Sequence, residues 1–317
     1  MESFAFSVIM AVYNTGSFLE EAVESLIHQT YGFEKIQLIL VDDGSTDGSG
    51  ARCDEYQTRY PHNVLALHKP NGGQSSARNM GVKHATGRYL NFMDSDDKMD
   101  ANVFEEVAKF LQAHDGEADV IAIPIYFFGT RDGGHKLNAK FRQGTRVIDL
   151  EAEWRNVQLS SASAFVRTEA ARKYCFQEDL VMAHAEDARE LNKLLIHNPK
   201  LGVVAGAAYR YRKWGSSTLD GSERKKKSYN DYVADFPLWI MAYSQREVHR
   251  IPKFLQYTVL FDLQWKIKQP KIPDGVLTEE ESASIFNSSG KRFNTSMKMF
   301  SRRLLACRRS KSCLRGN

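Results

Sequence analysis

The most constraining feature of this sequence is an apolar run that ends in three carboxylates within four positions. Residues 88–97 read Arg-Tyr-Leu-Asn-Phe-Met-Asp-Ser-Asp-Asp, and the carboxylates are Asp94, Asp96 and Asp97. Such a run predicts a strand buried in a parallel sheet, and open α/β sheets bind ligands beyond the carboxyl ends of their strands. Carboxylates there can hold Mg²⁺ or Mn²⁺, which in turn binds a diphosphate. An acidic loop that caps the next helix is the alternative.

Strand and helix patterns alternate regularly over the first 126 residues. The expected strands cover residues 6–12, 36–41, 64–68, the run before Asp94, and 119–126, and the expected helices follow Ser17, Asp47, Ser75 or Ser76, and Asn102. This alternation predicts an α/β fold with a mainly parallel, Rossmann-like, doubly wound sheet flanked by helices. Right-handed crossovers place the carboxyl ends of the strands on one edge, so the loops at residues 13–14, 42–47 and 94–97 should line one crevice.

The remaining sequence predicts further elements and a C-terminal helical extension. We expect a hairpin or lid over residues 129–144, strands over 158–167 and 203–211, a loop entering a helix over 178–196, and helices over 229–246 and 252–268. Periodicity fades after residue 282. The predicted organisation is a main domain at 1–218 (a nucleotide-binding half at 1–128 and an acceptor-binding half at 129–218), a helical extension at 219–270, and a linker with a basic, disordered tail at 271–317.

The charge distribution does not indicate a nucleic-acid-binding fold. The chain has 43 Lys and Arg residues against 39 Asp and Glu, a formal charge of +4. Residues 291–317 hold nine of the basic residues and no acidic one, so the rest of the chain carries 34 basic against 39 acidic residues, a charge of −5. The positive charge belongs to the tail, and we expect no nucleic-acid partner.

Several features predict a cytoplasmic protein. No run of about 18 apolar residues appears, and the N-terminus lacks the pattern of a signal peptide. The four cysteines are scattered, without the spacing of metal ligands or disulfides, which fits a reducing compartment. Met, Phe and Leu among the basic residues of the tail would suit peripheral contact with anionic lipid at the inner face of a membrane. A solvated tail is the alternative.

Five short motifs occur in the order and spacing of one known family. They are Ser7-Val-Ile-Met-Ala-Val-Tyr-Asn14, Val41-Asp-Asp-Gly-Ser-Thr-Asp47, Asn71-Gly-Gly-Gln-Ser-Ser-Ala-Arg-Asn79, Asp94-Ser-Asp96 and Glu186-Asp187. Each motif alone is weak, but together they span residues 1–218, and the chain resembles the inverting glycosyltransferases of family 2, which have the GT-A fold. Met10-Ala11 departs from the family pattern, because many relatives have a proline there; the departure affects only a backbone turn.

The resemblance implies a site for a nucleotide-sugar donor, most simply a UDP-sugar. The implied nucleotide-binding residues are Val12, Tyr13, Asn14, Asp42, Asp43, Asn71, Arg78, Asp94 and Ser95. Tyr13 would offer a ring beside the base. Either Asp42 or Asp43 would accept a hydrogen bond from uracil N3–H or a ribose hydroxyl, and the choice between them stays open. Arg78 would contact the nucleotide or its phosphates; an exposed helix arginine is the alternative.

The resemblance also implies the chemical roles. Asp96, with Asp94 beside it on the ribose side, would hold Mn²⁺ or Mg²⁺ against the leaving diphosphate. Asp187, with Glu186 beside it, would be the general base for an acceptor hydroxyl. An acid pair favoured by a helix N-terminus is the alternative reading of that pair. A loop over the diphosphate would supply Arg212, Ser216 and Ser217. Trp214 would either stack on a sugar or pack.

Residues 256–265 resemble a segment that follows this domain in some wall teichoic acid and capsule enzymes. That resemblance implies a glycan, teichoic acid or lipid-linked acceptor for a hexosyl- or N-acetylhexosaminyltransferase. The chain could instead be a fragment of a larger bifunctional polymer-synthesis enzyme, or a non-catalytic nucleotide-sugar-binding domain. A dehydrogenase is excluded, because no Gly-x-Gly-x-x-Gly follows the first strand. A pyrophosphorylase would need a Gly-rich, basic loop there, where the chain has Tyr-Asn-Thr-Gly.

Overall fold

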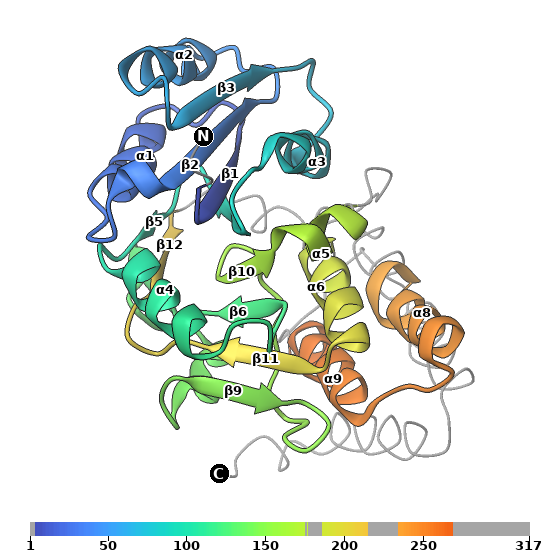
Figure 1. The fold of residues 1–317 in the computed structure, drawn as a ribbon. Coiled ribbons are helices and arrows are strands. Elements are labelled where there is room, and N and C mark those ends of the chain that lie inside the picture. Colours follow the sequence, from blue (N-terminus) through green and yellow to red (C-terminus); the bar gives the residue numbers. More distant parts are fainter. Residues whose placement is uncertain (1–3, 175, 177–185, 215–233, 269–317) are drawn as a thin grey trace.

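The computed structural model describes residues 4–174, 176, 186–214 and 234–268. Figure 1 shows a large sheet with helices on both faces and a smaller sheet beside it. The strand order is β3-β2-β1-β4-β10-β6-β11-β9 in the large sheet and β5-β12-β7-β8 in the small one. The predicted α/β class, with a sheet flanked by helices, is therefore confirmed.

The large sheet is mainly parallel, as predicted, but two antiparallel strands make it mixed. Its strands are β1 (Phe6–Val12), β2 (Ile36–Asp42), β3 (Val64–His68), β4 (Tyr89–Asp94), β6 (Val120–Ala122), β9 (Arg146–Asp149), β10 (Ala164–Arg167) and β11 (Lys200–Val203). β1 runs parallel to β2 and β4, whereas β10 runs antiparallel to both β4 and β6, and β9 antiparallel to β11. All seven residues of β2 are buried, as expected for a strand covered on both faces.

Helices cover the two faces of this sheet and form two cores. They are α1 (Phe18–Ile27), α2 (Ser49–Arg59), α3 (Gln74–His84), α4 (Val103–Ala113), α5 (Thr168–Lys173), α6 (Glu186–His197), α8 (Trp239–Val248) and α9 (Lys253–Lys268). Leu38 and Leu40 of β2 pack with α1, α2 and α4, and Ile39 and Val41 pack with the core of α3, α5, α6, α8 and α9. Successive side chains of a strand point to opposite faces of the sheet, so alternate residues of β2 belong to different cores.

Two predicted strands are each divided between the two sheets. The strand expected over residues 119–126 ends as β6 at Ala122, and β7 (Ile125–Gly129) begins after Pro124 in the small sheet. Proline has no N–H to donate and interrupts the ladder. The strand expected over 203–211 likewise becomes β11 and β12 (Tyr209–Lys213), because the small residues Val-Ala-Gly-Ala-Ala at 204–208 carry the chain from one sheet to the other.

The region between these strands also differs from expectation. A hairpin does form, but from β7 and β8 (Gly133–Gly134), so it begins before the expected range of 129–144, and a short helix η2 (Lys136–Phe141) follows within that range. The strand expected over 158–167 is limited to β10, because Gln158 Nε2 donates to the carbonyl oxygen of Ser160 at 2.7 Å and holds the preceding residues in a loop. Strands β5 (Lys98–Met99) and β9 were not predicted; both pair through few residues.

Two helix starts can be compared with the prediction. Ser17, which directly precedes α1, lies in the right-handed helical region, and its side chain makes no capping hydrogen bond. Helix α3 begins at Gln74 and not at Ser75 or Ser76, with Gly73 at its cap. Gly73 has a φ of +86°, which favours glycine, and its N–H donates to Asp43 Oδ2 at 2.7 Å. The contact to a neighbouring loop fixes the start of this helix.

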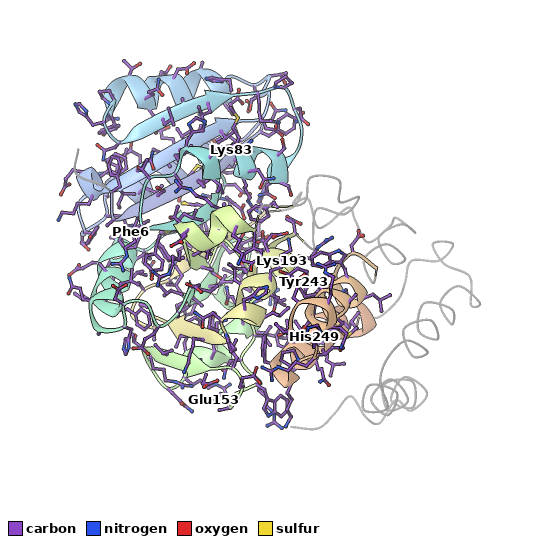
Figure 2. The ribbon with its side chains drawn as sticks, turned by 45° about the vertical axis from the view of Figure 1, so that its right-hand side comes forward. Phe6, Lys83, Glu153, Lys193, Tyr243 and His249 are labelled. Carbon is purple, nitrogen blue, oxygen red and sulfur yellow. The ribbon has the colours of Figure 1, made fainter. Side chains whose placement is uncertain are left out.

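The C-terminal helices pack on α6, the helix that carries Glu186 and Asp187. Figure 2 labels Lys193 and Tyr243 at this contact. His197 on α6 forms a 3.0 Å hydrogen bond with the Tyr243 hydroxyl on α8. A π-helical turn (Ala234–Leu238) leads directly into α8, and residues 229–233, where the predicted helix begins, lie outside the described residues. Among the helices that the structure describes, none is long and apolar enough to cross a bilayer.

Lys140 gives a stability prediction that depends on pH. Its ammonium is buried and donates to the carbonyl oxygens of Leu137 and Val157, and burial lowers the pKa of Lys140 to about 7. The unfolded chain keeps this proton to about pH 10, so the free energy of unfolding should rise with pH between these values, by up to roughly 1.4 kcal/mol per unit.

Replacing Lys140 by Met should remove that rise and stabilise the protein most at neutral and lower pH. Urea unfolding of both proteins at pH 7, 8 and 9 measures the effect. If the free energy of unfolding changed with pH in the same way in both proteins, Lys140 would keep its proton in the folded state.

Candidate active site at the carboxyl edge of the sheet

The carboxyl ends of β1, β2 and β4 bring three loops to one edge, as the crossover argument predicted. Val12 pairs with Asp42, and Ala11 pairs with Asp94, so these strands end at the same level. The loop after β2 lies directly against the loop after β3. A Cβ on Gly44, whose φ is +79°, would lie 2.9 Å from the backbone nitrogen of Asn71. Glycine at this position therefore permits the close approach of the two loops.

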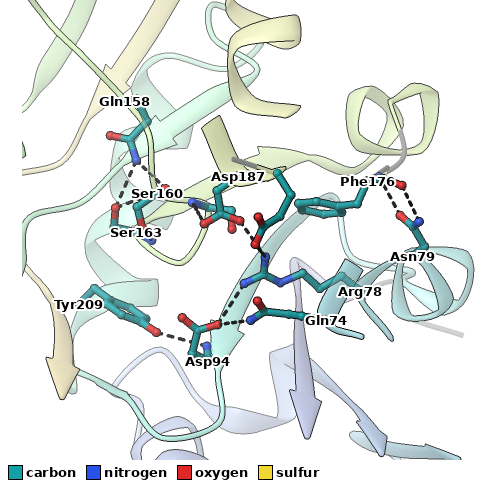
Figure 3. A network of polar contacts seen from close by, with 12 residues as sticks. Gln74, Arg78, Asn79, Asp94, Gln158, Ser160, Ser163, Phe176, Asp187 and Tyr209 are labelled. Carbon is teal, nitrogen blue, oxygen red and sulfur yellow. Dashed lines mark hydrogen bonds and ion pairs between the residues drawn. The ribbon is translucent and has the colours of Figure 1, made fainter. Parts of the chain in front are cut away.

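Arg78 of α3 joins two carboxylates that are far apart in sequence (Figure 3). Its Nη1 lies 2.7 Å from Asp187 Oδ1, and its Nη2 lies 3.0 Å from Asp94 Oδ1. Gln74, one helical turn earlier, donates to the same Asp94 oxygen at 2.8 Å. The backbone N–H of Ser161 donates to Asp187 Oδ2 at 2.9 Å. These contacts fix the positions of Asp94 and Asp187 relative to each other.

This cluster carries more negative than positive charge. Glu186 lies 3.8 Å from the Arg78 guanidinium, so one cation faces three carboxylates, and the arginine side chain is only 3% exposed. Burial raises the pKa of Asp94 to about 6, although Arg78 opposes the shift. Burial, followed by the charge of Asp187, raises the pKa of Glu186 to about 8. A divalent cation would relieve this repulsion.

The other two carboxylates of the acidic motif have different surroundings. Asp97 is buried and accepts hydrogen bonds from the Tyr209 hydroxyl at 2.7 Å and from the Arg212 backbone N–H at 2.6 Å. Burial, followed by the charges of Asp94 and Asp96, raises the pKa of Asp97 well above its usual range. Asp97 therefore anchors the acidic loop to β12 through Tyr209 and Arg212. Asp96 faces the outside of the loop, where its Oδ2 accepts from Trp214 Nε1 at 3.2 Å.

Arg212 and Trp214 close one side of the acidic loop. The Arg212 Nε donates to the carbonyl oxygen of Asp96 at 2.6 Å, and its guanidinium pairs with Glu21. The Trp214 ring lies 5.3 Å from the Phe18 ring, so it packs in this structure. Contact of Arg212 with a diphosphate would require it to exchange these partners, and its role there stays a prediction. Ser216 and Ser217, the other two residues of the predicted diphosphate loop, lie outside the described residues.

Asp43 organises the loop that precedes α3. Its Oδ1 accepts from Lys69 Nζ at 2.5 Å and from the Gly72 N–H at 2.9 Å, and its Oδ2 accepts from Gly73. The neighbouring Asp42 is also buried and contacts the Ser45 N–H and His68 Nδ1. Both aspartates thus have partners within the protein, and the choice between them for the nucleotide stays open.

The remaining predicted nucleotide residues lie around the same edge. The ring of Tyr13 is 53% exposed above the end of β1, and Asn14 has a φ of 49°, which aims its amide oxygen at the Thr46 N–H, 2.8 Å away. Val12 is buried, Asn71 is exposed, and Ser95 contacts the Thr15 hydroxyl at 2.9 Å. The structure therefore brings every described residue of the predicted site to this edge.

The donor groups at this edge fit a Mg²⁺ or Mn²⁺ ion that shares its ligands with a diphosphate. Asp94 Oδ2 and Asp96 Oδ1 accept no hydrogen bond from the described residues. Hard oxygen donors of this kind suit these ions, which bind through one or two carboxylates plus phosphate oxygens. Within the described ranges, no three His, Cys, Asp or Glu side chains are arranged to hold a metal ion by themselves. Such an ion would thus complete its coordination with the ligand and water.

Three residues of the cluster were not predicted from the sequence. Gln74 was read only as part of a motif, and Ser161 contributes through its backbone N–H. Tyr209, which is buried, was expected only as part of the strand over 203–211. The helical spacing of Gln74 and Arg78, four residues apart, was the available signal for Gln74. A backbone donor such as that of Ser161 leaves no signal in the sequence.

Comparisons with known proteins point to one family. The model of glycosyl transferase family 2 matches residues 7–175. The chain is 41% identical over 281 residues to the minor teichoic acid biosynthesis protein GgaB of Bacillus subtilis, covering 88% of this chain and 31% of that protein. It is 31% identical to GgaA of the same organism, covering 82% of this chain and 59% of that protein. The chain thus spans less than two thirds of the length of each of these relatives.

Solved structures with the same fold come from two other organisms. Residues 1–349 of TarS from S. aureus, in complex with UDP-GlcNAc, match with a TM-score of 0.69 at 21% identity, covering 91% of this chain and 80% of that one. The mannosyltransferase PcManGT from Pyrobaculum calidifontis, in complex with GDP-Man and Mn²⁺, matches with a TM-score of 0.58 at 15% identity, covering 98% and 82%. At these identities the likeness shows the fold alone.

Proposed function

Since the chain belongs to glycosyl transferase family 2, we propose that it is an inverting, metal-dependent glycosyltransferase with a UDP-sugar as donor. The observation that carries the proposal is the Asp94–Arg78–Asp187 bridge. One buried cation contacts both Asp94, the carboxylate on the donor side, and Asp187, the proposed base. The UDP-GlcNAc complex of the similar fold in TarS supports the choice of donor. The protein would thus act at the carboxyl edge of β1, β2 and β4.

The donor would lie across the loops at this edge. Tyr13 offers an exposed ring to the base, and the loop held by Asp43 brings backbone groups of residues 71–73 close to it. Asp94 and Asp96 would hold Mn²⁺ or Mg²⁺, which supplies neutralising charge to the leaving diphosphate. The hydrogen bond between Asp97 and Tyr209 would keep the acidic loop in position.

Asp187 would serve as the general base for the acceptor. It would take the proton of an acceptor hydroxyl as that oxygen forms a bond to the anomeric carbon. The bond between this carbon and the diphosphate oxygen breaks at the same time, and its electron pair leaves with UDP. A single in-line displacement inverts the configuration. The Arg78 and Ser161 contacts to Asp187 would orient its carboxylate for this role.

The acceptor would be a hydroxyl of a teichoic-acid-type polymer. The names of the two Bacillus relatives support this choice. Because the chain matches only part of each relative, a larger bifunctional enzyme would also be consistent with these matches. The proposed peripheral contact with a membrane rests on the basic tail, which lies outside the described residues.

Turnover of a UDP-sugar panel tests the proposal. The protein is incubated with each UDP-sugar, a polyol-phosphate acceptor and Mn²⁺ or excess chelator, and UDP release is measured. We expect release with Mn²⁺ and at least about 10²-fold less in chelator, because the leaving charge is then not neutralised.

The variant Asp96→Ala should lose this Mn²⁺ stimulation, because Asp96 Oδ1, a proposed ligand of the ion, accepts no hydrogen bond from the described residues. Asp115→Ala is the matched control, since Asp115 pairs with Arg88 on the surface away from the site. Full stimulation in Asp96→Ala would show that the ion binds elsewhere.

A further inference from the structure

One face of the small sheet combines aromatic rings with cations that form no ion pair with a carboxylate of the described residues. We define the cationic-aromatic face as Phe127, Arg131, His135, Tyr211 and Lys213. In the parallel pairing of β7 and β12, Phe127 lies opposite Tyr211, and Lys213 lies opposite Gly129. Side chains two residues apart on a strand point to the same side, so Tyr211 and Lys213 share one face.

The rings and cations of this face contact one another. The Arg131 guanidinium lies 4.8 Å and the Lys213 Nζ 5.7 Å from the centre of the Phe127 ring, so two cations lie beside one ring. Lys213 Nζ is also 4.6 Å from the Tyr211 ring. The His135 ring meets Phe127 edge-on at 5.6 Å. The arrangement therefore places two positive charges around the same aromatic ring.

The charge of this face is uncompensated in the described part of the chain. Neither Arg131 nor Lys213 forms an ion pair with a described carboxylate, and neighbouring Asp132 pairs with neither of them. The pKa of His135 is lowered to about 4 by burial and then by Lys140, Lys213, Arg131 and Lys136, which is consistent with a positive local potential. By contrast, Arg210 and Arg212 of the same strand each pair with a carboxylate. An anion is the complementary ligand.

The face is connected along the chain to the proposed centre of reaction. Lys213 directly precedes Trp214, whose Nε1 donates to Asp96. Tyr211 packs with Leu159 against the same small apolar cluster, and two residues beyond Leu159 the Ser161 N–H donates to Asp187. Short chain segments therefore join the face to residues that contact Asp96 and Asp187.

We propose that the cationic-aromatic face binds a phosphodiester group of the acceptor polymer, with Arg131 and Lys213 contacting the phosphate. This inference rests on the proposed function and adds a subsite to it. Guanidinium and ammonium groups form charge-assisted hydrogen bonds to phosphate oxygens, and aromatic rings pack on the carbon faces of sugars or polyols. A repeating polyol phosphate presents both features at short intervals, whereas a neutral glycan presents only the second.

The double variant Arg131→Gln/Lys213→Gln tests this subsite. The probe is a fluorescently labelled glycerol-phosphate oligomer, with a neutral oligosaccharide of similar length for comparison, and binding is measured by anisotropy at two salt concentrations. We expect the double variant to bind the glycerol-phosphate oligomer about tenfold more weakly than the wild type, because two phosphate contacts are lost. Its binding should also depend less on the salt concentration. Calorimetric UDP binding should be unchanged.

The matched control is Lys35→Gln/Arg59→Gln, which removes two cations that also lie beside aromatic rings. Lys35 lies 5.1 Å from the Tyr31 ring and Arg59 lies 5.1 Å from the Tyr60 ring, both near the amino ends of the strands. Equal oligomer binding by the two double variants, or no binding by the wild type, would overturn the subsite. If the wild type binds the oligomer through this face but does not bind UDP, the proposed function fails and the anion subsite stands.

Discussion

Asp187→Asn is expected to retain UDP binding and to lose sugar transfer by roughly 10²- to 10⁴-fold, the range of general base catalysis. The carboxylate of Asp187 would accept the acceptor proton, and an amide cannot. Asparagine has nearly the same shape and can keep one of the two contacts, to Arg78 or to the Ser161 N–H. UDP release with a saturating acceptor, together with calorimetric UDP binding, separates the loss of chemistry from a loss of binding.

Glu186→Gln is the matched comparison for this prediction. Glu186 is the adjacent carboxyl, and burial, followed by the charge of Asp187, raises its pKa and so favours its protonated form. A glutamine imitates that neutral form, so we expect a much smaller loss of transfer. A large loss in Glu186→Gln together with retained activity in Asp187→Asn would move the base to Glu186.

Arg78→Met should lower the free energy of unfolding by roughly 3–5 kcal/mol, the cost of removing one member of a buried charge cluster. The guanidinium is buried against Asp94, Asp187 and Glu186, and its removal would leave these carboxylates without a cation. Since proteins of this kind are stable by only about 5–15 kcal/mol, the loss would be a large fraction of the total. Urea unfolding at neutral pH without added metal measures it.

Two further variants serve as comparisons for the loss of stability in Arg78→Met. Arg88→Met removes an exposed arginine that pairs with Asp115 on the surface, and should cost at most about 1 kcal/mol. Arg78→Lys keeps the charge but cannot contact Asp94 and Asp187 with a rigid fork, so its stability should lie between the wild type and Arg78→Met. If Arg78→Met were as stable as Arg88→Met, the carboxylate cluster would not depend on Arg78.

The sequence was sufficient to predict the parts of the fold that depend on local pattern. The strands β1 to β4 follow from apolar runs that end in turn residues, and their order along the chain implies one common edge. Asp94 and Asp42 could therefore be placed near each other without a structure. The prediction was wrong at residues 119–126 and 203–211, where an apolar run continues but the chain changes sheet. Periodicity does not contain that information.

The contacts within the site could not be predicted, because they join segments that are distant in sequence. Asp187 meets Arg78 across 109 positions, and Tyr209 meets Asp97 across 112. Both contacts depend on β10 and β12 entering the sheets beside β4 and β5, which no local pattern specifies. The motifs identified Arg78 as important but suggested contact with the nucleotide, whereas the structure shows it between two carboxylates.

Calorimetric titration of UDP into the purified protein, with Mn²⁺ and then with excess chelator, tests the metal-dependent UDP-sugar site at the carboxyl edge of the sheet. We expect binding in the micromolar range with Mn²⁺, at least about tenfold weaker binding in chelator, and loss of the difference in Asp96→Ala. Equal affinity for UDP in both conditions would contradict the metal site at Asp94 and Asp96. No binding in either condition would contradict the assignment of this edge as a UDP-sugar site.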